Sequence, residues 1–215
     1  MAASQNLMAL GNNFRQFHSR WMAKARRHNH KGLQQSFDRF FTLYVVFNHL
    51  YAEATFQLAN HGQVRIQNRN RFPDAEAAQE YVVQFLGADR LLQELNNDKS
   101  AQAALLSLQA QVCNGAFNLK LNMVTGAAQS NEDADLCRRL TGTNRNEQAA
   151  AILETLYAVR CNMFHGRKGF NPIQRALLDP LNVILERVIE ILYRALDGGQ
   201  QIVGRERRGR VFQLE

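Results

Sequence analysis

The sequence predicts an all-α fold in a single domain. Three observations lead to this class. Its 215 residues fit one domain with a sizeable core. The chain has only three prolines and is rich in residues that favour helices. Its apolar residues recur at helical spacing rather than in short alternating runs. A turn-rich sandwich or barrel is therefore excluded, and no apolar run is long enough to span a membrane.

The first helix is expected from about residue 4 to residue 27. Its apolar seam has the 3-4-3-4 spacing of a helix face that packs on a partner surface, and it comprises Leu7, Leu10, Phe14, Phe17 and Trp21. The segment is amphipathic, carries arginines and lacks acids, so it also resembles a mitochondrial transit peptide. The large residues of the seam favour a structural helix.

The second helix is expected to begin near Leu33 and to form the centre of the fold. Residues 37–47 are apolar nearly all round, which fits a buried helix or a buried strand. The helical continuation at 52–59 decides for the helix. Asn48 and His49 interrupt the apolar run. As a buried polar pair they would need hydrogen-bond partners. They therefore either hold neighbouring helices together through hydrogen bonds or support the functional site.

The middle of the chain, residues 61–144, predicts additional helices. Residues 60–73 form a polar connection whose arginines contact either phosphate or solvent. Asp74 opens a helix that ends at Gly87, with acids in its first turn. Further helices are expected at 88–96, 99–111 and 114–123, followed by a polar loop at 125–133 and a short helix to Leu140.

Two helices close the predicted domain, which spans residues 1–200. One is capped by Thr143 or Asn144 and ends near His165. The last begins near residue 173 and ends at the glycine pair 198–199, with a restart or kink near Asp179 because Pro180 follows. Residues 201–215 are expected to be a flexible basic tail.

The charge of the chain is concentrated at its two ends. The net charge is +7. Residues 1–36 carry six basic side chains and no acid, and residues 201–215 carry four arginines and two glutamates. The body between them is close to neutral. Basic ends favour the binding of polyanions such as RNA through counterion release. Alternatively, they are a basic helix exposed to solvent and a disordered tail, which would have the same composition.

The cysteines and the absence of several standard motifs reduce the number of function classes that fit this sequence. Three cysteines without a secretory signal predict reduced thiols in the cytoplasm. No cysteine pair has zinc spacing, and there is no glycine-rich phosphate loop and no nucleophile elbow. We therefore expect no metal and no cofactor.

One constellation with chemistry remains at the end of the helix before residue 166. It combines Arg160, Cys161, Asn162 and His165, and the cations Arg167 and Lys168 follow. RNA can be cut without a metal when its 2′-hydroxyl attacks the neighbouring phosphorus. Histidine suits the acid and base steps because its pKa lies near 6.5.

Each remaining residue of this constellation has a possible role in that reaction. Arginine suits the phosphoryl charge because it stays ionised and its fork matches phosphate oxygens. Asn162 would orient the imidazole or the phosphate from nearly the same helix face as His165. Alternatively, Arg160 pairs with Glu154 or Asp179, and His165 caps the helix.

The helix geometry favours a homodimer if this motif is catalytic. With 3.6 residues in each helical turn, Arg160 and His165 project about 140° apart. One histidine also cannot easily be both acid and base. Two copies facing across a dyad would gather two histidines and two arginines around one cleft. An active variant that is monomeric would contradict this hypothesis.

At these residues the sequence resembles the HEPN (higher eukaryotes and prokaryotes nucleotide-binding) superfamily. One block, YAVRCNMFHGRK at 157–168, is similar to the family's Arg-x(4–6)-His motif. The other, SFDRFFTLYVVFNHLYAEA at 36–54, is similar to its early core helix. With the last helix these blocks cover somewhat under half of the chain. The family often has Asn, Asp or His directly after the arginine, where this chain has Cys161.

The resemblance implies an up-and-down helical bundle, usually a homodimer with the motif at the interface. It implies a metal-independent endoribonuclease acting in defence, in toxin–antitoxin pairs or in RNA processing, with Arg160 and His165 as the catalytic pair. A nucleotidyltransferase-type antitoxin or another defence protein would be a partner. Two alternatives stay open: a HEPN module without catalysis that binds RNA, nucleotide or protein, and a helical scaffold with basic ends.

Overall fold

The computed structural model describes residues 10–28, 32–66, 72–122, 124–164 and 171–198. Within these ranges the chain is helical, with one isolated bridge between Leu121 and Ala128, which confirms the all-α prediction. The elements are α1 (Asn12–Arg27), α2 (Leu33–Asn60), α3 (Asp74–Glu76), the π-helical η1 (Ala77–Tyr81), α4 (Val82–Leu86), α5 (Ala88–Asn97), α6 (Lys99–Cys113), α7 (Ser130–Thr141), α8 (Arg145–Phe164), the 3-10 helix η2 (Pro172–Gln174) and α9 (Arg175–Asp197).

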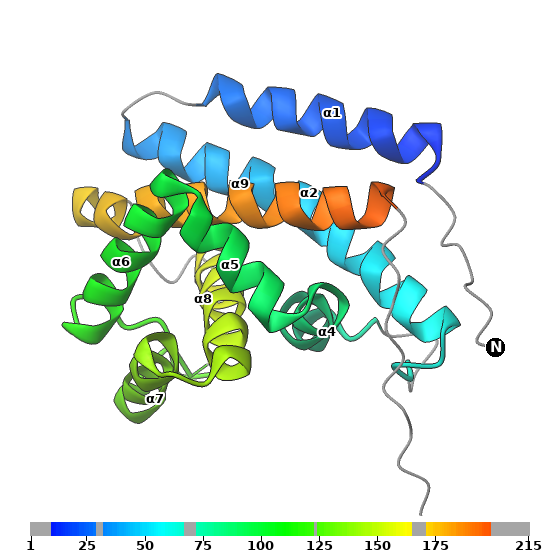
Figure 1. Cartoon of the computed structure of the whole chain (residues 1–215). Coiled ribbons are helices and arrows are strands. Elements are labelled where there is room, and N and C mark those ends of the chain that lie inside the picture. The colour runs from blue at the N-terminus through cyan, green and yellow to red at the C-terminus, as the bar shows by residue number, and fades with distance from the viewer. Residues whose placement is uncertain (1–9, 29–31, 67–71, 123, 165–170, 199–215) are drawn as a thin grey trace, which may run out of the picture.

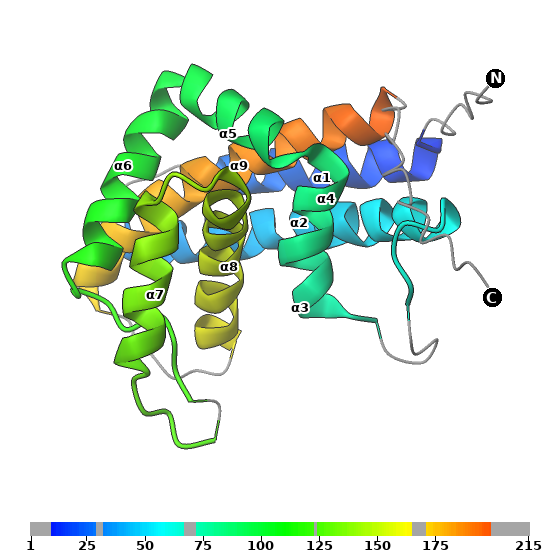
Figure 2. The ribbon, with the colours of Figure 1, turned by 60° about the horizontal axis from the view of Figure 1, so that its bottom comes forward.

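Helices α2 and α9 form the centre of the bundle and run side by side, with α1 packed on α2 (Figure 1). Helices α7, α8 and the α3–α4 stretch cross this layer steeply (Figure 2). The sequence explains the central position of α2 and α9. Each is long and carries buried apolar side chains along most of its length, so each must be covered by neighbouring helices.

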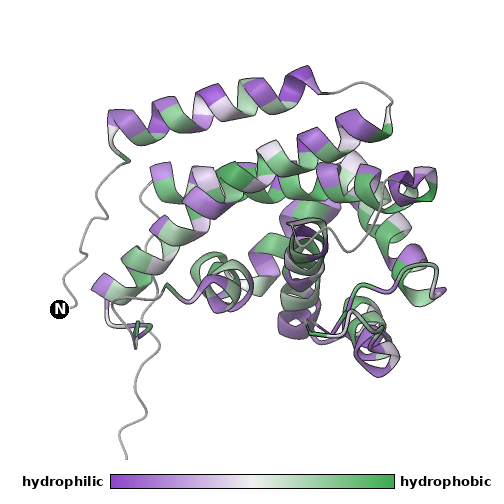
Figure 3. Ribbon diagram, turned by 180° about the vertical axis from the view of Figure 1, so that it is seen from behind, coloured by the Kyte–Doolittle hydropathy of each residue, from purple (hydrophilic) through white to green (hydrophobic). Residues whose placement is uncertain are grey.

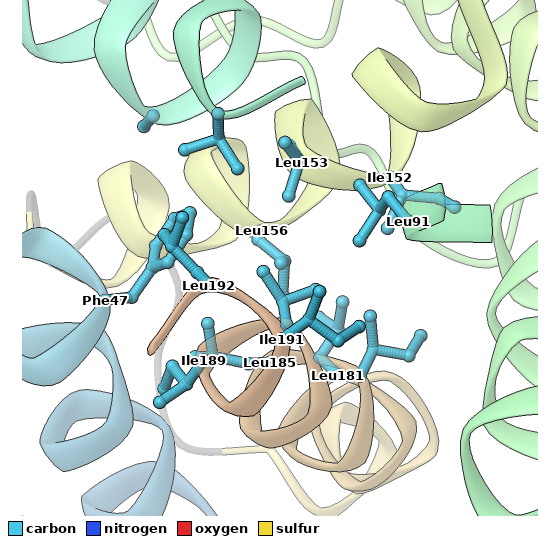
Figure 4. Close-up of a cluster of buried hydrophobic side chains, with 14 of the residues drawn as sticks. Phe47, Leu91, Ile152, Leu153, Leu156, Leu181, Leu185, Ile189, Ile191 and Leu192 are labelled. Carbon is cyan, nitrogen blue, oxygen red and sulfur yellow. The ribbon is translucent and has the colours of Figure 1, made fainter. Parts of the chain in front are cut away.

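The core lies where α2, α5, α8 and α9 meet (Figure 4). Its members are almost fully buried, and close packing of such side chains is the main stabilising contribution in a fold of this kind. Labelled examples are Phe47, Leu91, Ile152, Leu156 and Leu185. This core fixes the position and rotation of α8. The polar side chains in the last turns of α8 therefore have defined directions.

Helix α1 packs on α2 through aromatic side chains and turns a hydrophilic surface outward (Figure 3). Phe14 and Phe17 contact the ring of His49, with ring centres 4.4 and 4.5 Å apart. His49 and its neighbour Asn48 are nevertheless exposed. The expectation of a buried polar pair is therefore wrong, because this stripe of α2 lies at the edge of the α1 contact. Residues 4–9 of the expected first helix lie outside the described residues.

Residues 74–86 form one continuous helical stretch, as the sequence predicts, but with a π-helical turn in the middle. Asp74 begins it and Gly87 ends it at φ +82°. The π-helical turn, η1, buries Ala77 and Ala78. A π turn carries one extra residue per turn and is frequent at functional sites.

The expected helix at 114–123 is wrong: residues 114–122 form an irregular turn. The Asp133 carboxylate accepts hydrogen bonds from the backbone N–H groups of Leu119 and Lys120, at 3.1 and 2.9 Å. Gly115, at φ +69°, stops α6 just before it. Phe117 and Leu119 are buried, so the segment packs as a covering loop.

The expectation of three reduced thiols is also wrong. Cys113 at the end of α6 and Cys137 on α7 form a disulfide, with Cα atoms 5.1 Å apart, and only Cys161 is a free thiol. The sequence spacing hid this pair because the turn at 114–129 brings α7 back alongside α6.

Helix α9 runs without interruption through Pro180, so the expected restart near Asp179 does not occur. Pro180 is buried, and the residues beside it tie α9 to α2. The Ser36 hydroxyl donates to Asp179, and Asn182 Nδ2 donates to the Ser36 carbonyl at 3.0 Å. The predicted tail at 201–215 lies outside the described residues.

Candidate functional site

Arg160 lies in the last turns of α8, and its guanidinium enters a half-buried polar cluster. Nη1 is 3.8 Å from Asp74 Oδ2 at the start of α3. The guanidinium carbon lies 5.7 Å from the ring centre of Tyr44 and 5.8 Å from that of Tyr157. These are cation–π distances. The acid, the two rings and the packing of α2, α3 and α8 hold the positive charge at one place.

Asp74 connects this cluster to α2. Its carboxylate accepts a hydrogen bond from the Tyr51 hydroxyl and another, at 3.4 Å, from the Tyr157 hydroxyl. We call Tyr44, Tyr51, Asp74, Tyr157 and Arg160 the arginine cluster. Acid and arginine lie 86 residues apart in the chain, so the pairing depends on the way in which α3 and α8 meet.

Burial controls the protonation of the tyrosines in the arginine cluster. Burial raises the pKa of Tyr44, Tyr51 and Tyr157 far above the usual value, and at Tyr51 the hydrogen bond to Asp74 adds to this effect. All three phenols therefore stay protonated at neutral pH, and those of Tyr51 and Tyr157 donate hydrogen bonds to Asp74. The cluster then has one cation, one carboxylate and three neutral phenols, which balances the buried charges.

Asn162 points to a different place from Arg160. It is buried, with 6% of its surface exposed, and its Nδ2 donates to the Leu119 carbonyl at 2.9 Å. Two positions that are two residues apart on a helix differ by about 200° in direction, which explains the separation. The structure therefore gives Asn162 a structural partner in the covering loop and does not bring it into the arginine cluster.

A polar cleft of about 220 Å³ opens beside Asn162 and Cys161. We call it the α8 cleft. It lies between one face of α8, the π-helical η1, the loop residues 119–121 and 129, and Glu132 at the start of α7. Its polar lining includes Gln79, Lys120, Gln129, Glu132 and Glu154.

Several predicted site residues cannot be compared with this geometry. His165, Arg167 and Lys168 lie outside the described residues. Asn48, exposed on α2, has no place in the arginine cluster. Cys161 is half-buried at the α8 cleft, with its Sγ 3.8 Å from Arg160 Nη1.

The alternative ion pairs expected for Arg160 are wrong. Glu154 pairs with Lys120 and Arg139, and Asp179 pairs with Arg175. Among the described residues, no three His, Cys, Asp or Glu side chains gather where they could hold a metal ion. No described helix is both long and apolar enough to cross a lipid bilayer.

Sequence reasoning missed the acid and the tyrosines of the arginine cluster. Asp74 was predicted only as the first-turn acid of a helix, and the tyrosines only as apolar core. One signal was available for the tyrosines: Tyr44 and Tyr51 are seven residues apart, on one stripe of α2. No signal in the sequence links this stripe to Asp74.

The chain was also compared with known proteins. No family model, curated protein or solved structure matches it. The arguments that follow therefore depend on the geometry of this chain and on the resemblance at residues 36–54 and 157–168.

Proposed function

We propose that the protein is a homodimeric, metal-independent endoribonuclease of the HEPN type. In this proposal it cuts RNA by attack of the 2′-hydroxyl on the adjacent phosphorus and leaves a 2′,3′-cyclic phosphate. Arg160 stabilises the phosphoryl charge, and His165 serves as acid and base. Arg167 and Lys168 hold the RNA backbone. The biological role is that of a toxin or defence effector, with a nucleotidyltransferase-type antitoxin as its partner.

The observation that carries this proposal is the fixed charge of Arg160. A guanidinium held in place before the reaction stabilises developing charge without reorganisation. Its separation from Asp74, 3.8 Å, is longer than an N–H···O hydrogen bond. An incoming phosphate would therefore compete with this ion pair. His165 follows five residues later in the sequence, and in the proposed dimer the arginine and the histidine that serve one phosphate come from facing copies of the chain.

The decisive experiment is cleavage of single-stranded RNA in excess EDTA. We expect cyclic-phosphate products from the wild type. Arg160→Ala should lower the rate at least about 100-fold, since one such stabilising donor is worth that much. His165→Ala should lower it about 100- to 10,000-fold. Arg145→Ala is the matched control, because Arg145 lies at the other end of α8 and pairs with Asp89.

Three outcomes would contradict the proposal. One is full cleavage by both Arg160→Ala and His165→Ala. Another is a strict requirement for a divalent ion, and the third is cleavage that leaves a 3′-hydroxyl on one product and a 5′-phosphate on the other. Toxicity on expression that both substitutions relieve, and that Arg145→Ala does not, would support the effector role.

One observation favours the second candidate function, a module that binds RNA, nucleotide or a protein partner without catalysis. Arg160 already has a carboxylate and two aromatic rings around it, as a purely structural arginine would. RNA binding that is unaffected by Arg160→Ala, together with no cleavage, would select this function.

We also infer that the protein acts in the cytoplasm. A disulfide is rare in that compartment, and Cys113 and Cys137 are disulfide-bonded in the structure, so the inference needs a test in cells. Fractionation of cells should place the protein with cytoplasmic markers. Recovery of the protein from an oxidising compartment would contradict the inference.

A further inference from the structure

The α8 cleft is not used by the chemistry proposed above. It lies along one face of α8, which contributes Glu154, Tyr157, Ala158, Cys161 and Asn162. These residues are spaced i, i+3, i+4, i+7 and i+8, so they form one stripe. The stripe includes Cys161, whose Sγ is 3.8 Å from Arg160 Nη1. A molecule in the cleft would therefore lie next to the arginine that is proposed to stabilise the phosphoryl charge.

The volume of the cleft limits what it can hold. Pockets for drug-sized ligands measure about 300–1,000 Å³, and this cleft measures about 220 Å³. It is large enough for one flat ring system and too small for a chain of nucleotides. The opposite wall, at Leu119 and Leu121, and the ring of Tyr157 provide apolar surface for such a ring.

The charges of the cleft exclude a phosphate as its occupant. Lys120 is the one basic side chain in the lining that the structure describes, and it already pairs with Glu154. Burial alone would raise the pKa of Glu154, but the hydrogen bonds from Arg139 and Lys120 outweigh it and lower the pKa. Glu154 is thus an anion that neutralises this cation. A phosphate would also meet the exposed carboxylate of Glu132.

The remaining polar groups are suited to a donor on a ring. Glu132 accepts hydrogen bonds and cannot donate them while ionised. Gln129 Nε2 donates to Glu132 Oε1 at 2.7 Å, which orients the carboxylate. Gln79, on the π-helical turn, adds an amide from the opposite side. Exocyclic amino groups of adenine, cytosine and guanine are donors of this kind, and uracil has none.

We propose that the α8 cleft binds a single nucleobase that carries an exocyclic amino group. Glu132 recognises the amino group, Gln129 orients Glu132, and Tyr157 supports the ring. Where the ribonuclease proposal holds, on which this second part rests, the enzyme cuts next to A, C or G in preference to U. Single-stranded RNA presents unstacked bases to protein pockets in this way.

The first test measures binding and needs no catalysis. CMP, AMP, GMP and UMP are titrated into the full-length protein, and the side-chain amide NMR signals of Gln79, Gln129 and Asn162 are followed. At least one amino-bearing nucleotide should bind at least about tenfold more tightly than UMP, since one specific polar contact to a base provides about that discrimination. Inorganic phosphate should leave these signals unchanged.

Substitutions of one glutamate inside the cleft and one outside it test whether Glu132 recognises the base. Glu132→Ala should weaken the preferred nucleotide at least about tenfold, and Glu132→Gln should reduce the preference over UMP because an amide also donates. Glu147→Ala is the matched control, since Glu147 lies near the start of α8, outside the cleft. Equal binding of all four nucleotides, no binding, or no effect of Glu132→Ala would overturn the proposal.

The two proposals fail in different ways. Cleavage of RNA with no base preference, unchanged in Glu132→Ala, leaves the ribonuclease intact and refutes the base cleft. Nucleotide binding that depends on Glu132, with no cleavage of any RNA, supports the cleft and refutes the ribonuclease.

Discussion

Arg160 illustrates how a site residue is built from neighbours far away in the sequence. Its charge is matched by Asp74 at the start of α3 and covered by Tyr44 on α2 and Tyr157 on α8. Each partner is fixed by its own helix. A charged group that is half-buried in this way keeps one position, which is the condition for electrostatic stabilisation of a reacting phosphate.

The raised pKa values of the cluster tyrosines predict a loss of stability in alkali. Tyr51 keeps its proton in the folded protein above pH 10, where the unfolded chain releases it. The folded state then binds more protons, so the free energy of unfolding falls as pH rises, by about 1.4 kcal/mol per pH unit for one group. Urea titrations between pH 10 and 11 measure this dependence. In Tyr51→Phe the free energy of unfolding should fall less steeply with pH, by about the contribution of one group.

The control for this measurement is Tyr81→Phe, which affects a less buried phenol on η1 and should change the slope less. An identical alkaline slope in Tyr51→Phe and the wild type would show that the Tyr51 proton is not held by the fold.

At the scale of one element, α1 is the described helix with the most one-sided charge. It contains no acid. Arg20, Lys24 and Arg27 are exposed and recur at i, i+4 and i+7, so they share one stripe. Arg15 and Arg26 instead form ion pairs, with Asp197 and Glu186. The stripe is thus the part of α1 that is suited to contact the RNA backbone.

Replacing Arg20, Lys24 and Arg27 by glutamine should weaken RNA binding and its dependence on salt. Three phosphate contacts on a single strand contribute about 2 to the slope of log K against log salt concentration, so the slope should fall by about that amount in fluorescence anisotropy titrations. The matched control replaces Arg138, Arg145 and Arg175, which already pair with acids. Equal slopes in the two triple variants would exclude α1 as the contact.

The disulfide is the second feature that belongs to single elements. Cys113 and Cys137 join α6 to α7 and close a loop with a sequence separation of 24. That loop contains Leu119, to which Asn162 is bonded, and Lys120, which pairs with Glu154. The disulfide thus limits the motion of one wall of the α8 cleft.

Replacing Cys113 by serine should lower the free energy of unfolding by about 3 kcal/mol, the usual effect of opening a loop of this length. Urea denaturation under oxidising conditions measures it. Cys161→Ser is the control and should have a much smaller effect, because Cys161 is a free thiol. If dithiothreitol leaves the wild-type midpoint unchanged, the crosslink does not stabilise the fold.

At the scale of the whole molecule, the sequence predicted the helices better than the contacts between them. Helical periodicity is a local property, so the bounds of α5, α6 and α8 could be anticipated within a few residues. The turn at 114–123 could not, because the Asp133 carboxylate and the burial of Leu119 override its local helix propensity. The exposure of Asn48 depends on where α1 ends its contact, and no pattern within α2 reveals it.

The candidate site was likewise predicted only in part: residues on one helix could be predicted, and their contacts with other segments could not. Arg160 and Asn162 were singled out from the residue types at the end of one helix, and both lie on α8, but Asn162 points away from Arg160 to the Leu119 carbonyl. Their partners, Asp74 and the Leu119 carbonyl, come from other segments. Such pairings follow from the packing of whole helices, which spacing along the chain does not encode.

The largest-scale prediction is that the protein is a dimer with one shared site. Sedimentation equilibrium should give twice the mass of a single chain.

Arg160→Ala and His165→Ala should each be inactive alone, since one lacks both arginines of the cleft and the other both histidines. When the two variants are mixed and allowed to exchange subunits, a heterodimer retains one arginine and one histidine in the same cleft. RNA cleavage should therefore reappear in part on mixing, since one of the two histidines is missing, whereas a mixture in which one partner carries both substitutions should stay inactive. Full cleavage by a monomer would contradict the shared site, because one helix directs these two side chains about 140° apart.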